Sequence, residues 1–85
     1  MVKKTKLLTR ILNNPGNVKF ANLVKIVMAF GFEHDRTNGG HHIFCHPHIP
    51  ELINLQEVKG KAKPYQVKQF IALVERYGLT MKEKA

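Results

Sequence analysis

The spacing of apolar residues changes twice along this 85-residue chain, and these changes limit the folds that it can adopt. Up to Gly31 the apolar residues recur at helical spacing, from there to about Gln56 they alternate, and after Pro64 the helical spacing returns. A glycine at position 31 is also a typical helix end. Strands in a row with helices at both ends favour an α+β fold, in which one antiparallel sheet carries its helices on one face.

Three helices and three strands are expected, within a single domain over residues 1–85. The apolar stripes predict helices over residues 3–12, from Ala21 or Asn22 to Phe30, and from Pro64 to the stop at Gly78. Asn22 is the expected N-cap of the second helix. Alternation predicts strands over residues 32–36, 41–46 and 52–56. The prolines at 47 and 50 are expected in the loop between the last two strands.

The chain has a formal net charge of +8, from 14 Lys and Arg against six Asp and Glu. Such a balance favours a polyanionic partner, with nucleic acid as the first choice. A charge that only keeps a small domain soluble is the alternative. The sequence does not indicate an oligomeric state.

Nothing in the sequence predicts a membrane segment, because no apolar run approaches the roughly 18 residues that a membrane helix needs. Leu7 and Leu8 follow a basic start, but Thr9 and Arg10 interrupt them before a signal-peptide core develops. The lone Cys45 has no partner for an internal disulfide. We therefore expect a cytoplasmic protein.

Two glycines lead into a pair of histidines at the start of the second expected strand. Thr37 to Gly40 reads as a turn, and its Asn38-Gly39 pair suits a two-residue hairpin loop. The flexible backbone of Gly39 and Gly40 allows a close approach to a phosphate. Alternation then puts His41 and His42 on opposite faces of the sheet. An imidazole beside such a turn suits removal of the proton from a ribose 2′-hydroxyl, which then attacks its own phosphate. A half-exposed strand histidine without a catalytic role is the alternative.

Basic residues gather in the segment before the last helix. Lys59, Lys61 and Lys63 alternate there, and Arg36 stands just before the hairpin turn. Antiparallel pairing is expected to bring Arg36 near the edge that holds His41. Cations at these positions would bind phosphates without reading bases and would stabilise the charge that grows on phosphorus. A solvated loop is the alternative.

A zinc site also has to be weighed, because all five histidines and the one cysteine lie within residues 34–48. A structural zinc site needs four convergent ligands. His41 and His42 are expected to face opposite ways, and no second cysteine accompanies Cys45. We therefore expect no metal and no cofactor, and we expect Cys45 to be a small buried residue.

The run from Gly39 to Pro47, GGHHIFCHP, resembles the glycine–small–histidine signature of the HicA (YcfA-like) toxins, the mRNA interferases of bacterial and archaeal toxin–antitoxin pairs. The resemblance extends over residues 18–79 and includes the helix before Gly31 and the lysine-bearing segment. The expected helix at 3–12 lies outside it and has no assigned role. The resemblance implies a fold like that of a double-stranded RNA-binding domain, with helices on one face of a three-stranded antiparallel sheet.

The resemblance also implies mRNA cleavage by one essential histidine, without a metal. His41 matches the position of that histidine, and His42 is the reserve candidate. The family usually has serine where this chain has Gly40, so any contribution from that hydroxyl is missing here.

A cognate HicB antitoxin that covers the catalytic surface is the partner that the resemblance implies, next to mRNA. A less basic or acidic antitoxin would be attracted to a toxin of this charge. Two other functions stay open at the level of sequence. One is an RNA-binding module of the same fold without catalysis, and the other is a metal-dependent site formed by the histidine cluster.

Overall fold

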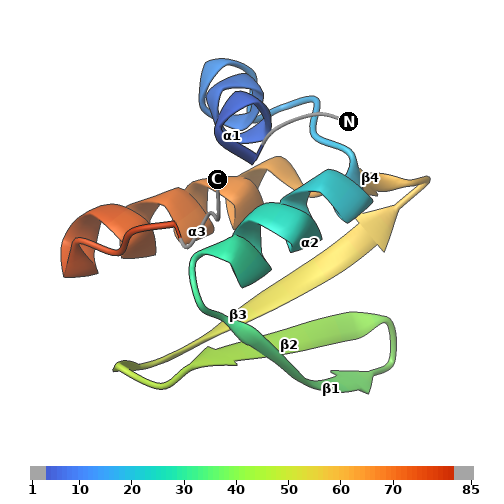
Figure 1. The fold of residues 1–85 in the computed structure, drawn as a ribbon. Coiled ribbons are helices and arrows are strands. Elements are labelled where there is room, and N and C mark those ends of the chain that lie inside the picture. Colours follow the sequence, from blue (N-terminus) through green and yellow to red (C-terminus); the bar gives the residue numbers. More distant parts are fainter. Residues whose placement is uncertain (1–3, 82–85) are drawn as a thin grey trace.

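The computed structural model describes residues 4–81, and in it two helices precede the strands and one helix follows them, as expected (Figure 1). In chain order the elements are α1 (Lys4–Asn13), α2 (Phe20–Ala29), β1 (Glu33–Asn38), β2 (His41–His46), β3 (Ile49–Val58), β4 (Lys61–Ala62) and α3 (Pro64–Tyr77). The α+β class with an antiparallel sheet is therefore confirmed. Within this described part of the chain, no helix has both the length and the apolar composition needed to cross a membrane.

The sheet has four strands in the order β1-β2-β3-β4, so the expectation of three strands is wrong. The additional strand, β4, comes from the lysine-bearing segment. Lys59 and Gly60 form a tight turn with φ angles of +52° and +81°, and Val58 pairs with Lys61 across it. The expected lysine loop is thus a hairpin, because two consecutive residues with positive φ reverse the chain at once.

Helix α2 begins at Phe20, one or two residues before the expected start. Its N-cap is Lys19, whose side chain makes no capping hydrogen bond. The amide of Phe20 instead donates to the carbonyl of Gly60 in the β3–β4 turn, at 3.0 Å. Asn22 therefore lies inside the helix and is not its cap, because a segment distant in sequence satisfies the first amide of the helix.

Strand β3 is ten residues long and includes Pro50, so the expectation of a loop at this proline is wrong. The register of β2 against β3 shifts between Phe44 and His46, and β4 pairs only with the far end of β3. Pro50 therefore lies in an irregular part of the ladder, where a missing N–H is tolerated.

The other boundaries lie close to those expected from the sequence. β2 has the expected bounds, and α3 has Pro64 in its first turn and Gly78 in the left-handed region at φ +59°. β1 extends as far as Asn38 because its pairing with β2 continues up to the turn. α1 ends at Asn13, one residue beyond its expected end, and the expected start at residue 3 lies outside the described residues.

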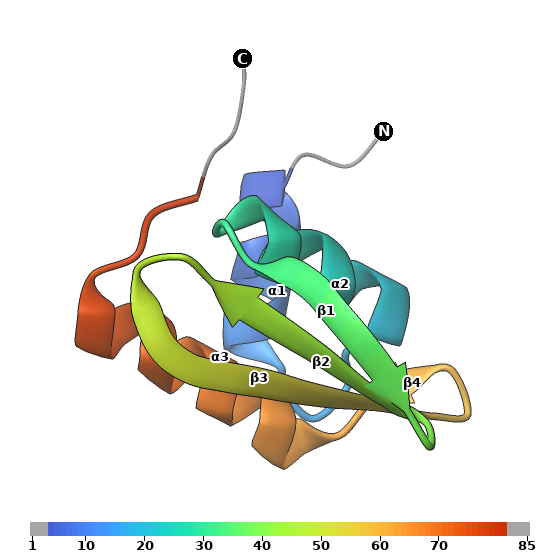
Figure 2. The same ribbon diagram turned by 90° about the horizontal axis from the view of Figure 1, so that it is seen from below.

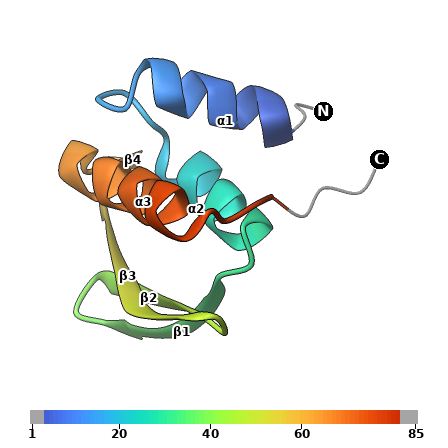
Figure 3. The same cartoon turned by 90° about the vertical axis from the view of Figure 1, so that its left-hand side faces the viewer.

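All three helices of the described chain lie on one side of the sheet, and the opposite face is open (Figures 2 and 3). α2 and α3 cover the sheet directly, and α1 lies on their outer side, where it buries Leu7 and Ile11. The core centres on the fully buried Phe70 of α3. Its ring lies 5.5 Å from that of Phe30 and 6.0 Å from that of Phe32, both in edge-to-face arrangements. Because the helices cover the face that carries Ile53 and Leu55, the polar residues that alternate with these, Asn54 and Gln56, lie on the open face.

Glu51, near the start of β3, is bonded to the last turn of α3. Its carboxylate accepts hydrogen bonds from the Tyr77 hydroxyl and from the Arg76 guanidinium, the latter at 3.1 Å. The bond from Tyr77, with a smaller contribution from Arg76, lowers the pKa of Glu51 from its ordinary 4.5. The same bond raises the pKa of Tyr77 above its ordinary 10.0. The carboxylate therefore stabilises the fold above its ordinary pKa, and this contribution is lost as the pH falls through the lowered value.

The Tyr77→Phe variant is expected to have a slightly lower Tm than the wild type at pH 7, since the phenol that donates to Glu51 is gone. The difference in Tm should narrow as the pH falls from the ordinary pKa of Glu51 through the lowered pKa of the wild type, below which the carboxylate is protonated in both proteins. Circular dichroism melts over a pH series measure this. Tyr65→Phe is the control, because Tyr65 is not bonded to a carboxylate. A Tyr77→Phe difference of constant size across the series would contradict the expectation.

Candidate active site

The β1–β2 turn lies within the expected segment, but its two loop residues are Gly39 and Gly40, one position later than the expected Asn38-Gly39 pair, because Asn38 still belongs to β1. Their φ angles are +57° and +83°, and Asn38 pairs with His41 across them, as in a type I′ hairpin turn. A Cβ on either glycine would have no atom within 4 Å. The glycines are therefore required by the backbone conformation rather than by space, and a serine at Gly40 would have room but a strained backbone. The tip of the turn is open to an incoming molecule.

His41 lies on the open face of the sheet. The neighbouring core residue Phe44 points toward the helices, and alternation along β2 puts His41 on the other side. The imidazole is half-buried and both of its nitrogens have partners on β3. Nδ1 lies 3.0 Å from Oδ1 of Asn54, and Nε2 lies 3.1 Å from Nε2 of Gln56. The ring is thus held in place but is not covered by the helices.

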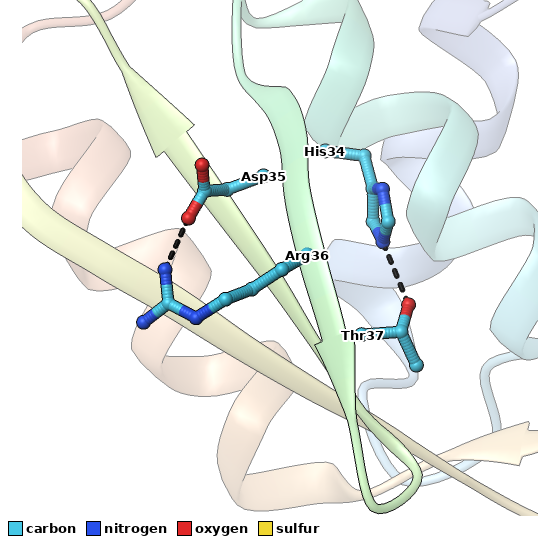
Figure 4. A network of polar contacts seen from close by, with 4 residues as sticks. All are labelled: His34, Asp35, Arg36 and Thr37. Carbon is cyan, nitrogen blue, oxygen red and sulfur yellow. Dashed lines mark hydrogen bonds and ion pairs between the residues drawn. The ribbon is translucent and has the colours of Figure 1, made fainter.

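His42 lies on the helix side of the sheet, so the two adjacent histidines face opposite ways, as expected. The His42 ring lies 5.0 Å from the ring of Phe20 on α2. Its Nδ1 is 3.4 Å from the hydroxyl of Thr37, which in turn lies 2.8 Å from Nε2 of His34. Figure 4 shows the contact between His34 and Thr37 on this side of β1. His42 therefore has a packed environment unlike that of His41.

Arg36 shares the open face with His41. The β1–β2 register shifts between His34 and Arg36, and the side chains of Asp35 and Arg36 lie on the side opposite to His34 (Figure 4). Arg36 pairs with Ile43, the next residue after His41 on that face of β2. Its guanidinium forms an ion pair with Asp35, and the two side chains are 59% and 42% exposed. An ion pair so exposed is weak, so the arginine is free to exchange its partner for a phosphate.

The lysines lie on the β3–β4 hairpin and just after it. This hairpin and the β1–β2 turn lie at the same end of the sheet (Figure 2). Lys61 donates to Oδ1 of Asn17 at 2.7 Å, Lys59 is exposed in the turn, and Lys63 is the N-cap of α3. The lysines thus gather at the end of the molecule that holds the glycine turn, whereas the direct partners of His41 are uncharged amides.

His46 and His48 contact the backbone and each other. His46 donates from Nε2 to the carbonyl of Phe30 at 3.1 Å, and its Nδ1 accepts the amide of His48 at 3.1 Å. A Cβ on Gly31, at φ +99°, would lie only 2.9 Å from Nε2 of His46. Within residues 4–81 no three His, Cys, Asp or Glu side chains come together as a metal site would need. Cys45 is half-buried, so the expectation that it is buried holds only in part.

Sequence reasoning missed the residues that surround His41. These are Asn54 and Gln56 on β3, which contact the imidazole, and Gln66 on α3, which is 3% exposed and is bonded to Gln56. The polar residues at 54 and 56 alternate with buried Ile53 and Leu55, which was the available signal that they face away from the core. No signal in the sequence pointed to Gln66.

Comparison with known proteins identifies a family. The family model described as the HicA toxin of bacterial toxin-antitoxin matches residues 20–79, which leaves α1 outside it. Neither the curated proteins nor the solved structures contain a match. The likeness to a double-stranded RNA-binding domain therefore stays a prediction. Because the family match extends from α2 through α3 and covers well over half of the chain, this protein belongs to the HicA toxin family.

Proposed function

We propose that this toxin is an endoribonuclease that cleaves mRNA with His41 and without a metal ion. The observation that carries the proposal is the position of His41, whose imidazole lies on the open face directly after an unobstructed glycine turn. The basic hairpin at the same end of the sheet supports it (Figure 2). His42, packed against α2, is the reserve candidate.

In the proposed reaction, His41 takes the proton of a ribose 2′-hydroxyl. The 2′ oxygen forms a bond to the adjacent phosphorus while the bond from phosphorus to the 5′ oxygen of the next nucleotide breaks. The leaving 5′ oxygen takes a proton from water. The products are a 2′,3′-cyclic phosphate and a 5′-hydroxyl. The amides of Gly39 and Gly40 and the guanidinium of Arg36 would stabilise the negative charge that grows on the phosphoryl oxygens.

Membership of the family implies an antitoxin as a partner of this toxin. We propose that the antitoxin is of the HicB type and that it covers the open face around His41. A net charge of +8 favours a partner of lower or opposite charge on the same surface that would attract RNA. We further propose that both proteins act in the cytoplasm, where mRNA is available.

Cleavage of a single-stranded RNA by the purified wild type, in the presence of a chelator, tests the proposal. A copy of the RNA with 2′-deoxyribose at the cleaved position should resist cleavage, because the attacking hydroxyl is missing. Activity that vanishes with chelator and returns with zinc would indicate a metal-dependent site instead. Binding of both RNAs without cleavage of either would favour the non-catalytic RNA-binding module.

Replacing Lys61 and Lys63 together by alanine is expected to weaken RNA binding and to flatten its dependence on salt. If each lysine contacts one phosphate of a single strand, the slope of log K against log salt should fall by about 1.4 in magnitude. Fluorescence anisotropy with labelled RNA at several salt concentrations measures the slope. Lys6→Ala combined with Lys25→Ala removes the same charge from exposed positions of α1 and α2. Equal slopes for the two double variants would show that the hairpin does not bind phosphate.

A further inference from the structure

A chain of hydrogen bonds connects the backbone of β3 to the imidazole of His41. It starts at the backbone N–H of Gln56, passes through the side chains of Gln66 and Gln56 to one ring nitrogen of His41, and continues from the other ring nitrogen to Asn54. The burial of Gln66, at 3% exposure, is unusual for a glutamine. Both ends of its amide are used within the protein, so its burial leaves no polar atom without a partner. A buried polar network of this kind fixes the orientation of each member.

The direction of every bond in this chain follows from its first donor. The backbone N–H of Gln56 can only donate, and it lies 2.7 Å from Gln66, so the amide oxygen of Gln66 must face it. The nitrogen of the Gln66 amide then faces the side-chain oxygen of Gln56, at 3.3 Å. This in turn directs the Gln56 amide nitrogen toward Nε2 of His41, at 3.1 Å.

The last two bonds determine which nitrogen of His41 carries the proton. Since the amide nitrogen of Gln56 donates, Nε2 of the neutral ring has to accept and therefore carries the lone pair. Nδ1 then carries the hydrogen, which it donates to the amide oxygen of Asn54 at 3.0 Å. The bonds at the two ring nitrogens thus agree with each other and with the single tautomer protonated at Nδ1.

We infer that Gln66 and Gln56 are positioning residues that hold His41 as the Nδ1–H tautomer, with Asn54 as the acceptor, and so make Nε2 the nitrogen that takes the proton from RNA. The inference rests on the proposed function for its catalytic consequence, but the tautomer itself is a property of the free protein. The 2′-hydroxyl of the substrate replaces the Gln56 amide as the donor to Nε2. Because Gln66 reaches His41 only through Gln56, its effect on cleavage is one of orientation.

Gln66→Glu tests the inference because it reverses the chain. A carboxylate at this position still accepts the backbone N–H of Gln56 but has no N–H to donate. The Gln56 amide then turns its nitrogen toward the carboxylate and its oxygen toward His41, which requires a proton on Nε2. We expect the ¹⁵N signal of Nε2, recorded at about pH 8 where an ordinary imidazole is neutral, to move from the position of a bare nitrogen to that of a protonated one.

Cleavage by Gln66→Glu should show a lower kcat with little change in KM, because RNA still binds but meets a protonated nitrogen. The expected loss lies between about tenfold and 10⁴-fold, the upper figure being that of a serine protease whose histidine is held as the wrong tautomer. Gln69→Glu is the matched control, since it adds the same charge at an exposed position of the same helix. It should leave both the ¹⁵N signals and kcat as in the wild type.

A wild-type spectrum with the proton on Nε2, or unchanged signals in Gln66→Glu, would overturn the inference. Should the buried carboxylate prevent folding, Gln56→Glu places an acceptor directly against Nε2 at a half-buried position, and the same shift of the Nε2 signal is expected. The spectra need no RNA, so the inference on the tautomer can be tested independently of the proposed function. If the spectra change as expected but the wild type does not cleave RNA, the proposed function alone is refuted. If the wild type cleaves RNA but the spectrum of Gln66→Glu is the same as that of the wild type, the inference alone is refuted.

Discussion

Replacing His41 by alanine is expected to lower kcat for RNA cleavage by about 10²–10⁴-fold, the range typical of losing a general base. The fold should be retained, because the half-buried ring contacts polar side chains on the open face and not the core. After its removal, Asn54 and Gln56 lie at the surface and bond to water instead. Cleavage rates at saturating RNA, together with thermal melts, measure both effects.

His42→Ala is the matched control, because it removes an adjacent imidazole from the other face of the same strand. That ring packs against Phe20 and lies within reach of Thr37, so its loss should lower the Tm more than the loss of His41. Cleavage by this variant at a temperature where it is folded should stay close to that of the wild type. The reverse pattern, with His41→Ala active and His42→Ala folded but inactive, would move the catalytic role to His42.

Phe70→Ala is expected to lower the free energy of unfolding by about 3–5 kcal/mol. The ring is fully buried at the centre of the core and contacts Phe30 and Phe32 edge-to-face. Its truncation removes the contacts that α3 makes with Phe30 and Phe32, the residues that follow α2. A loss of this size is a large share of the roughly 5–15 kcal/mol that stabilises a typical domain. Urea denaturation followed by circular dichroism measures it.

Two further variants identify the cause of that loss. Phe70→Leu keeps most of the buried apolar volume and should recover more than half of the lost stability. Gln69→Ala, at the neighbouring exposed position, should change the free energy of unfolding by less than about 0.5 kcal/mol. A loss below about 1 kcal/mol for Phe70→Ala would mean that this ring is not at the centre of the core.

The sequence alone determined the features that depend on neighbouring residues. The order of the three helices and the first three strands, and the bounds of β2, followed from the period of the apolar residues. A tight turn within residues 37–40 followed from the glycines there, which tolerate positive φ angles, although its two loop residues lie one position later than expected. The opposite orientation of His41 and His42 followed from the alternation of any strand. Each of these is a local property, fixed within a few residues of the chain.

The tertiary structure decided what depends on residues far apart in sequence. The turn at Lys59 and Gly60 returns the chain to β3 as a fourth strand and also supplies the carbonyl that accepts the first amide of α2. The hydrogen-bond network of His41 consists of residues 13 to 25 positions further along the chain. The register of β2 on β3 places Asn54 and Gln56 beside the imidazole, and the packing of α3 places Gln66 beside Gln56. Local patterns predict on which face of a sheet a side chain lies. They do not predict which residues contact it there, because strand register and helix placement depend on the packing of the whole core.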